Sequence, residues 1–281
     1  MKATDGRAAP TAILPIFPED APLAWAAICG AVSAGSRWEW MTLGRVLIAI
    51  VLAEFIFRWS AWLISQGNLQ VKQPPSSTTA SLPYAVPDSQ AQRLSRVFAK
   101  LRALWVLPRG LWMRTLVFFF LAGLLLAYGL GTPGIWVGIL GLVIAPLSGV
   151  WLKKRPGAAQ VWSPLTWMTL AWMLGTLAAG GAAGWFMAAA PVFGAAASGL
   201  AALRGGKAWG RALALAGLTA PAAILIAHRL MLPAAAALFV AAPAYVLALR
   251  VEGTSERRAR ALQPLLWTSM AVAALALGWW I

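Results

Sequence analysis

The chain has 281 residues, of which 60% are hydrophobic and only 11% are charged. Soluble domains carry about 25% charged residues, so this composition excludes a water-soluble domain and predicts an integral membrane protein. The formal net charge of +15 is divided among separate short connections, which favours membrane topology and anionic lipid over nucleic acid. The single cysteine, Cys29, excludes an internal disulfide and a cysteine metal cluster.

The first elements in chain order are a tail, a short apolar segment and a long helix. Residues 1–21 are expected to form an N-terminal tail without a signal peptide. Segment 22–36 is apolar but short, so it forms either a ninth span or a re-entrant or interfacial segment. A long helix follows over about 38–65, and Trp38 and Trp40 at its start are typical of a membrane interface.

A large cytoplasmic loop over 67–111 separates this helix from the rest of the chain. Its first part is rich in proline, serine and threonine, which predicts an irregular connection. From about 89 to 105, apolar residues recur every three or four positions, and cations occupy other positions, namely Arg93, Arg96, Lys100 and Arg102. Such a basic amphipathic helix is expected to lie on the inner leaflet, either as a topological anchor or as a docking site for a partner.

Further apolar stretches, each near the length of a span, follow the loop. They are 112–131, 134–152, 164–183, 185–203, 209–228, 231–249 and 262–281. Together with the long helix and segment 22–36, they predict an all-α polytopic transmembrane bundle of eight or nine spans, arranged as serial hairpins. We expect residues 1–281 to form this single transmembrane domain.

The positive charges predict the orientation of the bundle. Lysine and arginine gather in the loop 67–111 and in the connections near 154, 206 and 256. The alternate turns, at 131–134, 180–184 and 228–231, contain one positive charge, that of Arg229. Because cytoplasmic connections carry the excess of positive charge, we expect a multi-pass protein of the inner (cytoplasmic) membrane with its C-terminus outside. The N-terminus is inside if 22–36 spans the membrane and outside if it does not.

Two ionisable residues within the long helix form the main candidate site. Glu54 and Arg58 are four residues apart, so they share one helical face and can pair. The pair either neutralises itself structurally or, with Asn68 just beyond the helix, binds a ligand or a lipid headgroup. The sequence identifies no catalytic residue and no metal site, since His228 is the only histidine, and it leaves the cofactor unknown.

The predicted topology resembles that of the UbiA prenyltransferase superfamily, which has nine helices, an inner N-terminus, an outer C-terminus and enlarged inner loops. The resemblance implies two aspartate-rich motifs after the second and sixth helices. The corresponding stretch 66–90 contains one acid, Asp88, and the stretch 204–211 contains none. The resemblance therefore covers topology only and does not extend to diphosphate chemistry.

These features favour an accessory, scaffold or assembly subunit of a larger membrane complex. The reasons are that ionisable residues are nearly absent from the spans and that the basic interfacial helix is prominent. The expected partners are a bilayer with an anionic inner leaflet and other membrane subunits. Two alternatives stay open, namely an enzyme acting on a lipid or isoprenoid and a transporter of a hydrophobic solute.

Overall fold

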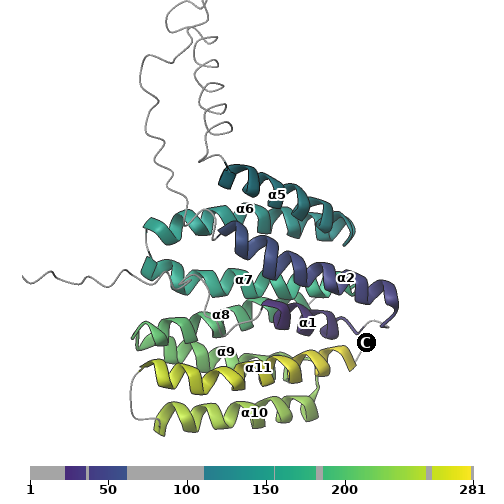
Figure 1. Cartoon of the computed structure of the whole chain (residues 1–281). Helices are drawn as coiled ribbons and strands as arrows, with labels where there is room; N and C mark the ends of the chain where they lie inside the picture. Colours follow the sequence, from purple (N-terminus) through teal and green to yellow (C-terminus); the bar gives the residue numbers. More distant parts are fainter. Residues whose placement is uncertain are drawn as a thin grey trace, which may run out of the picture.

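The computed structural model describes residues 23–35, 38–61, 111–154, 156–181, 186–250 and 255–279. Within these ranges the chain consists of helices joined by turns, and no strand occurs among them. The helices lie side by side as one bundle, with α5 at one edge and α10 at the opposite edge (Figure 1). The predicted all-α class is therefore confirmed for the described residues.

The bundle begins with the short helix α1 (Leu23–Ser33), which is followed by a longer helix in three parts. These parts are α2 (Trp40–Ile50), the π-helical segment η1 (Val51–Phe57) and a last α-helical turn that ends at Ala61. The other helices are α5 (Leu111–Tyr128), α6 (Thr132–Lys154), α7 (Pro156–Ala178), α8 (Phe186–Arg204), α9 (Trp209–Ala227), α10 (Met231–Arg250) and α11 (Ser255–Trp279). Helices suit this apolar sequence because they satisfy the backbone hydrogen bonds internally, where hydrocarbon offers no partner.

Four of the described helical stretches are long and apolar enough to cross a membrane. They are Trp40–Ala61, Thr132–Trp151, Trp209–Ala227 and Ala261–Trp279. Shorter apolar helices accompany them, namely Leu23–Ser33, Arg114–Tyr128, Ala189–Arg204 and Met231–Pro243. By length and composition the chain is a membrane protein with multiple spans, and the total of eight or nine stays a prediction. The expected tail 1–21, the interfacial helix at about 89–105 and nearly all of the loop 67–111 lie outside the described residues.

Two helices begin earlier than the apolar stretches that predicted them. α7 begins at Pro156 and α11 at Ser255, whereas the apolar stretches begin at residues 164 and 262. Hydropathy identifies only the part of a helix that lies in hydrocarbon. A helix extends into the interface for as long as its backbone hydrogen bonds continue. Proline is favourable at the first position of α7 because its missing N–H would have no intrahelical partner there.

The centre of the bundle is α7, which contacts α1, α2, α6 and α8, while α1 lies between α7 and α11. Glycines allow α1 and α7 to approach closely. A Cβ atom on Gly30 would overlap the carbonyl of Trp172, and a Cβ atom on Gly175 would overlap the carbonyl of Ala27. Close backbone contact of this kind provides the dispersion attraction that associates helices in lipid, where burial of apolar surface gives no gain.

Exposed aromatic side chains gather near both ends of the helices. At the end where α2 begins and α11 ends, which we call the Trp40 end, they are Trp38, Trp40, Tyr128, Trp136 and Trp279. At the opposite end, which we call the Trp59 end, they are Trp59, Trp151, Trp162 and Trp209. Trp40 and Trp59 are about 28 Å apart at ~1.5 Å per residue, close to the ~30 Å of a hydrocarbon core. The two groups therefore have the spacing of the aromatic belts that mark membrane interfaces.

Candidate functional site

The candidate site lies on the π-helical segment of the spanning stretch Trp40–Ala61. η1 is 7 residues long and contains Glu54. Its buried side chains hold it against the bundle, and the ring of Phe57 lies 5.8 Å from the ring of Trp167 in α7. π-Helical segments are rare and occur frequently at functional sites, so Glu54 is placed in an unusual part of the backbone.

The carboxylate of Glu54 accepts hydrogen bonds from two different elements. Its Oε2 atom accepts the backbone N–H of Leu23, the first residue of α1, at 3.0 Å. Its Oε1 atom accepts a hydrogen bond from Nη1 of Arg58 at 2.5 Å. The predicted pairing of Glu54 with Arg58 is thus present as an ion pair between residues four apart. The bond to α1 adds a connection that the sequence did not indicate.

α1 is only 11 residues long, or about 16 Å, roughly half of a ~30 Å hydrocarbon core. Hydrogen bonds fix it to its neighbours: Thr176 of α7 donates to the carbonyl of Gly30 at 3.1 Å, and the indole of Trp25 donates to the carbonyl of Trp267 in α11 at 3.3 Å. The described part of segment 22–36 is therefore a buried half-length helix. Whether the whole segment spans the membrane stays open, since residues before Leu23 are outside the described part.

A helix that begins inside a membrane exposes backbone N–H groups and the positive end of its dipole. A carboxylate compensates both, because it accepts hydrogen bonds and carries negative charge. Glu54 therefore supplies a hydrogen-bond acceptor and a negative charge at the described start of α1. This accounts for an acidic residue in an otherwise apolar helix without requiring any reaction.

The depth of the site follows from its distance to the exposed tryptophans. Glu54 lies about 21 Å along the helix from Trp40 and about 7 Å from Trp59, at ~1.5 Å per residue. Arg58 directly precedes Trp59, so its guanidinium can reach the interface at the Trp59 end. The side chains of Glu54 and Arg58 are 21% and 31% exposed, which leaves part of the pair accessible to a lipid headgroup.

The other candidate residues from the sequence are not brought to this site. Asn68, Arg93, Arg96, Lys100 and Arg102 all lie outside the described residues. His228 is exposed in the turn between α9 and α10. In the described ranges, no group of three or more histidine, cysteine, aspartate or glutamate side chains could hold a metal ion.

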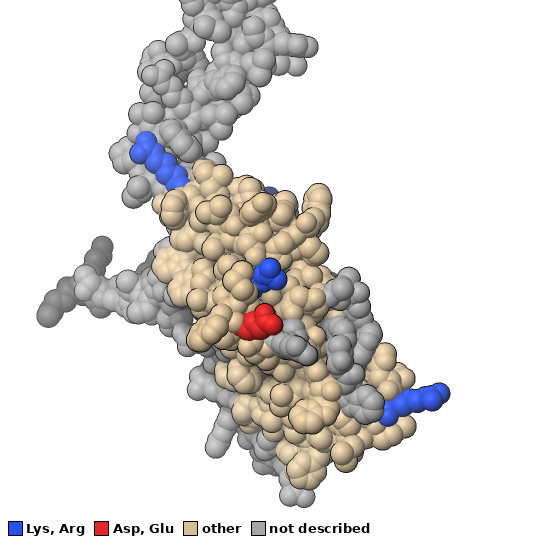
Figure 2. All heavy atoms as spheres, turned by 90° about the vertical axis from the view of Figure 1, so that its right-hand side faces the viewer, with Lys and Arg blue, Asp and Glu red and all other residues tan. Residues whose placement is uncertain are grey.

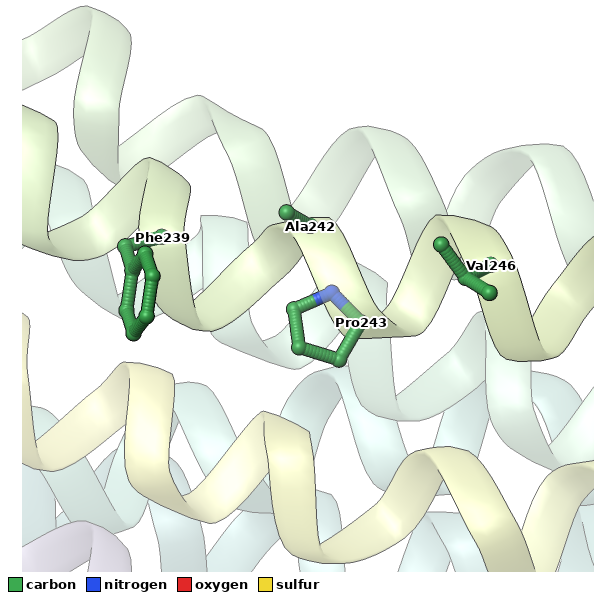
Figure 3. Close-up of a pocket in the computed structure, with 4 residues that line it drawn as sticks. All are labelled: Phe239, Ala242, Pro243 and Val246. Atoms are coloured by element: carbon green, nitrogen blue, oxygen red, sulfur yellow. The ribbon is translucent and has the colours of Figure 1, made fainter.

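Few charged side chains and few grooves lie elsewhere on the described surface. Figure 2 shows the side on which α11 ends, where the described residues are mostly uncharged and the charged groups, mainly basic, lie apart from one another. A shallow groove on α10 is lined by Phe239, Ala242, Pro243 and Val246, which lie along one stretch of that helix (Figure 3). Its lining is apolar, so it offers no group for chemistry.

Sequence reasoning missed a polar contact between α8 and α11. Nη2 of Arg204 donates to Oε1 of Gln263 at 3.0 Å. Gln263 directly precedes Pro264 in the mainly apolar part of α11 that begins at Ala261. An amide side chain at such a position is the signal that could have indicated an interhelical partner. The contact joins helices near the Trp59 end.

Comparisons of the chain with models of protein families, with curated proteins and with solved structures find no significant match.

Proposed function

We propose that the chain is a non-catalytic accessory, scaffold or assembly subunit of a larger membrane complex. The observation that carries the proposal is that Glu54, the acid within the helix, is engaged in contacts within the bundle. Its two carboxylate oxygens accept hydrogen bonds from Leu23 and Arg58 of the same chain. An acidic side chain that links one helix to another by a hydrogen bond has a structural role. A bundle stabilised by such links is suited to binding other subunits.

The surface that we assign to a partner lies on α5, at the edge of the bundle (Figure 1). Large side chains on α5 are 59% to 73% exposed at spacings of three and four residues, namely Phe118, Leu121, Leu125 and Tyr128. This 3-4-3 spacing is the one by which a second helix inserts its side chains between those of the first. The expected interfacial helix at 89–105, with Arg93, Arg96, Lys100 and Arg102, directly precedes α5 and would extend the contact to the anionic inner leaflet.

The proposed location is the inner (cytoplasmic) membrane, with the Trp59 end toward the cytoplasm and the C-terminus outside. The support comes from the cations of the connections near 154, 206 and 256, which belong to the Trp59 end.

Photo-crosslinking in intact cells tests the accessory role. A benzophenone amino acid at Leu121 or Leu125 should give a crosslink to one or a few defined proteins. The same group at Leu174, which is fully buried in α7, serves as the matched control and should give none. Isolation in mild detergent should recover the same partners. A chain that runs as a lone monomer and crosslinks only to lipid at both α5 positions would rule out the proposal.

A second candidate function is that of an enzyme acting on a lipid or isoprenoid, and a specific observation favours it. Glu54 and Arg58 keep part of their side chains exposed within lipid-headgroup reach of the Trp59 end, and an arginine can hold a phosphate. Glu54→Gln and Arg58→Ala should then change the lipid extract of cells, with accumulation of one species. An unchanged extract in cells with normal protein levels would count against this reading.

A further inference from the structure

In the described part of the chain, the turns after α7, α8 and α9 close in the same way. A backbone N–H beyond each helix bonds to the carbonyl five residues earlier: Gly181 to Thr176 at 3.0 Å, Lys207 to Ala202 at 2.9 Å, and Leu230 to Leu225 at 2.9 Å. This is the Schellman motif, in which the residue before the last donor adopts the left-handed conformation.

The left-handed residue differs among these turns. Gly180 and Gly206 occupy the position after α7 and α8, with φ of 80° and 76°. After α9 the position is occupied by Arg229, with φ of 62°, and among the described residues it is the one non-glycine residue with positive φ. A residue with a Cβ atom is strained in this conformation, whereas glycine is not. Arg229 thus stands where the chain elsewhere uses glycine.

Arg229 is also unfavourable by its charge at this end of the bundle. At the Trp40 end, the turns 129–131 and 179–185 contain no lysine or arginine, and the connection between α1 and α2 contains one cation, Arg37. The turn after α8, at the opposite end, contains Lys207. Since positive residues favour the cytoplasmic side, a cation among the turns at the Trp40 end opposes the orientation set by the other loops. One residue therefore carries two independent costs, and such a residue points to a function.

The surroundings of Arg229 fit a lipid headgroup. Leu230 is 4% exposed and anchors the turn, while Met231 and Leu232 are 63% and 84% exposed at the start of α10. Trp279, 87% exposed at the same end, marks the level of the interface. Arg229, itself exposed, lies where the hydrocarbon surface meets the headgroups.

We propose that Arg229 binds the phosphate of a phospholipid in the leaflet at the Trp40 end. A guanidinium can hold a phosphate by two parallel hydrogen bonds. The lipid tail then covers the exposed apolar side chains of Met231 and Leu232. The strained backbone is kept because it aims the arginine out of the turn without disturbing the Schellman hydrogen bonds.

Thermal unfolding of the purified full chain in a neutral detergent tests the proposal. Without phospholipid, Arg229→Gly should melt a few degrees above the native chain, about 2–4 °C, because glycine relieves the strain. Gly180→Ala is the matched control, since a Cβ there meets no atom within 4 Å and adds only the unfavourable φ, so it should melt lower. Added phosphatidylglycerol should raise the melting temperature of the native chain and of Gly180→Ala by similar amounts, and that of Arg229→Gly by much less.

Several outcomes would overturn the proposal. One is an equal response of the native chain and Arg229→Gly to phosphatidylglycerol. Another is an equal response of the native chain to diacylglycerol, which has no phosphate, or to inorganic phosphate, which has no tail. A third is the loss of a co-purifying protein in Arg229→Gly with an unchanged response to lipid, because the arginine would then pair with an acidic partner. Arg229→Asn, which tolerates the left-handed conformation, replaces Arg229→Gly if the glycine variant does not fold.

Discussion

The Oε2 atom of Glu54 lies 3.0 Å from the backbone nitrogen of Leu23, a residue 31 positions earlier in the chain. In a soluble protein, water or a local side chain satisfies the first N–H groups of a helix. For Leu23, the first described residue of α1, the acceptor is a side chain of the neighbouring π-helical segment. The relationship ties the position of a half-length helix to one carboxylate.

Removal of this carboxylate should destabilise the protein. We expect Glu54→Ala to lower the free energy of unfolding by about 1–3 kcal/mol, since the Leu23 N–H then loses its acceptor in a dry environment. Glu54→Gln keeps an oxygen acceptor and should cost less. The matched control is Glu39→Ala, because Glu39 is exposed and makes no side-chain cap to α2. Thermal unfolding in detergent measures all three, and equal melting temperatures for Glu54→Ala and Glu39→Ala would refute a capping role.

A methyl group at the crossing of α1 and α7 should displace α1. In Gly175→Ala the new Cβ atom overlaps the carbonyl of Ala27, and neither backbone can yield without moving its helix. Overpacking of this kind costs about 1–3 kcal/mol. In Gly44→Ala the Cβ atom meets nothing within 4 Å, and the better helix propensity of alanine should leave the stability equal or slightly higher. If Gly175→Ala has the same melting temperature as Gly44→Ala, the close crossing of α1 and α7 is not present in the protein.

Two buried serines should respond in opposite ways to alanine. Ser198 of α8 donates to the carbonyl of Val161 in α7 at 2.6 Å, and interhelical bonds of this type contribute about 0.6 kcal/mol on average. The hydroxyl of Ser269 in α11 is fully buried and makes no hydrogen bond. Ser198→Ala should therefore lower the melting temperature, and Ser269→Ala should leave it unchanged or raise it. A larger loss for Ser269→Ala than for Ser198→Ala would mean that a bound polar molecule satisfies Ser269.

The proposed orientation predicts which turns face the outside of the cell. In a Cys29→Ala background, a membrane-impermeant maleimide applied to intact cells should label His228→Cys and not Lys207→Cys, since both positions are exposed in turns at opposite ends. Permeabilised cells should show labelling of both. The native chain is the control and should stay unlabelled, because Cys29 is 2% exposed. Labelling of Lys207→Cys alone in intact cells would reverse the orientation.

The features that the sequence predicts well are the ones that local physics decides. Helical segments follow from long apolar runs, and the Glu54–Arg58 pair follows from the geometry of residues four apart on a helix. The hydrogen bond from Leu23 to Glu54 could not be predicted, because it depends on where α1 docks. For the same reason the length of segment 22–36 left its role open. A half-length helix buried between α7 and α11 is as apolar as a short span, and hydropathy does not distinguish protein neighbours from lipid.

The place of α1 between α7 and α11 has a consequence for how the chain is made. The indole of Trp25 bonds to the carbonyl of Trp267, which is 242 residues later. At a synthesis rate of ~5–20 residues per second, the ribosome needs about 12–50 s to supply that partner. During this interval α1 can pack against α7 but lacks its contacts with α11. α11 therefore completes the packing around α1, so a chain truncated before α11 leaves one side of this early helix uncovered.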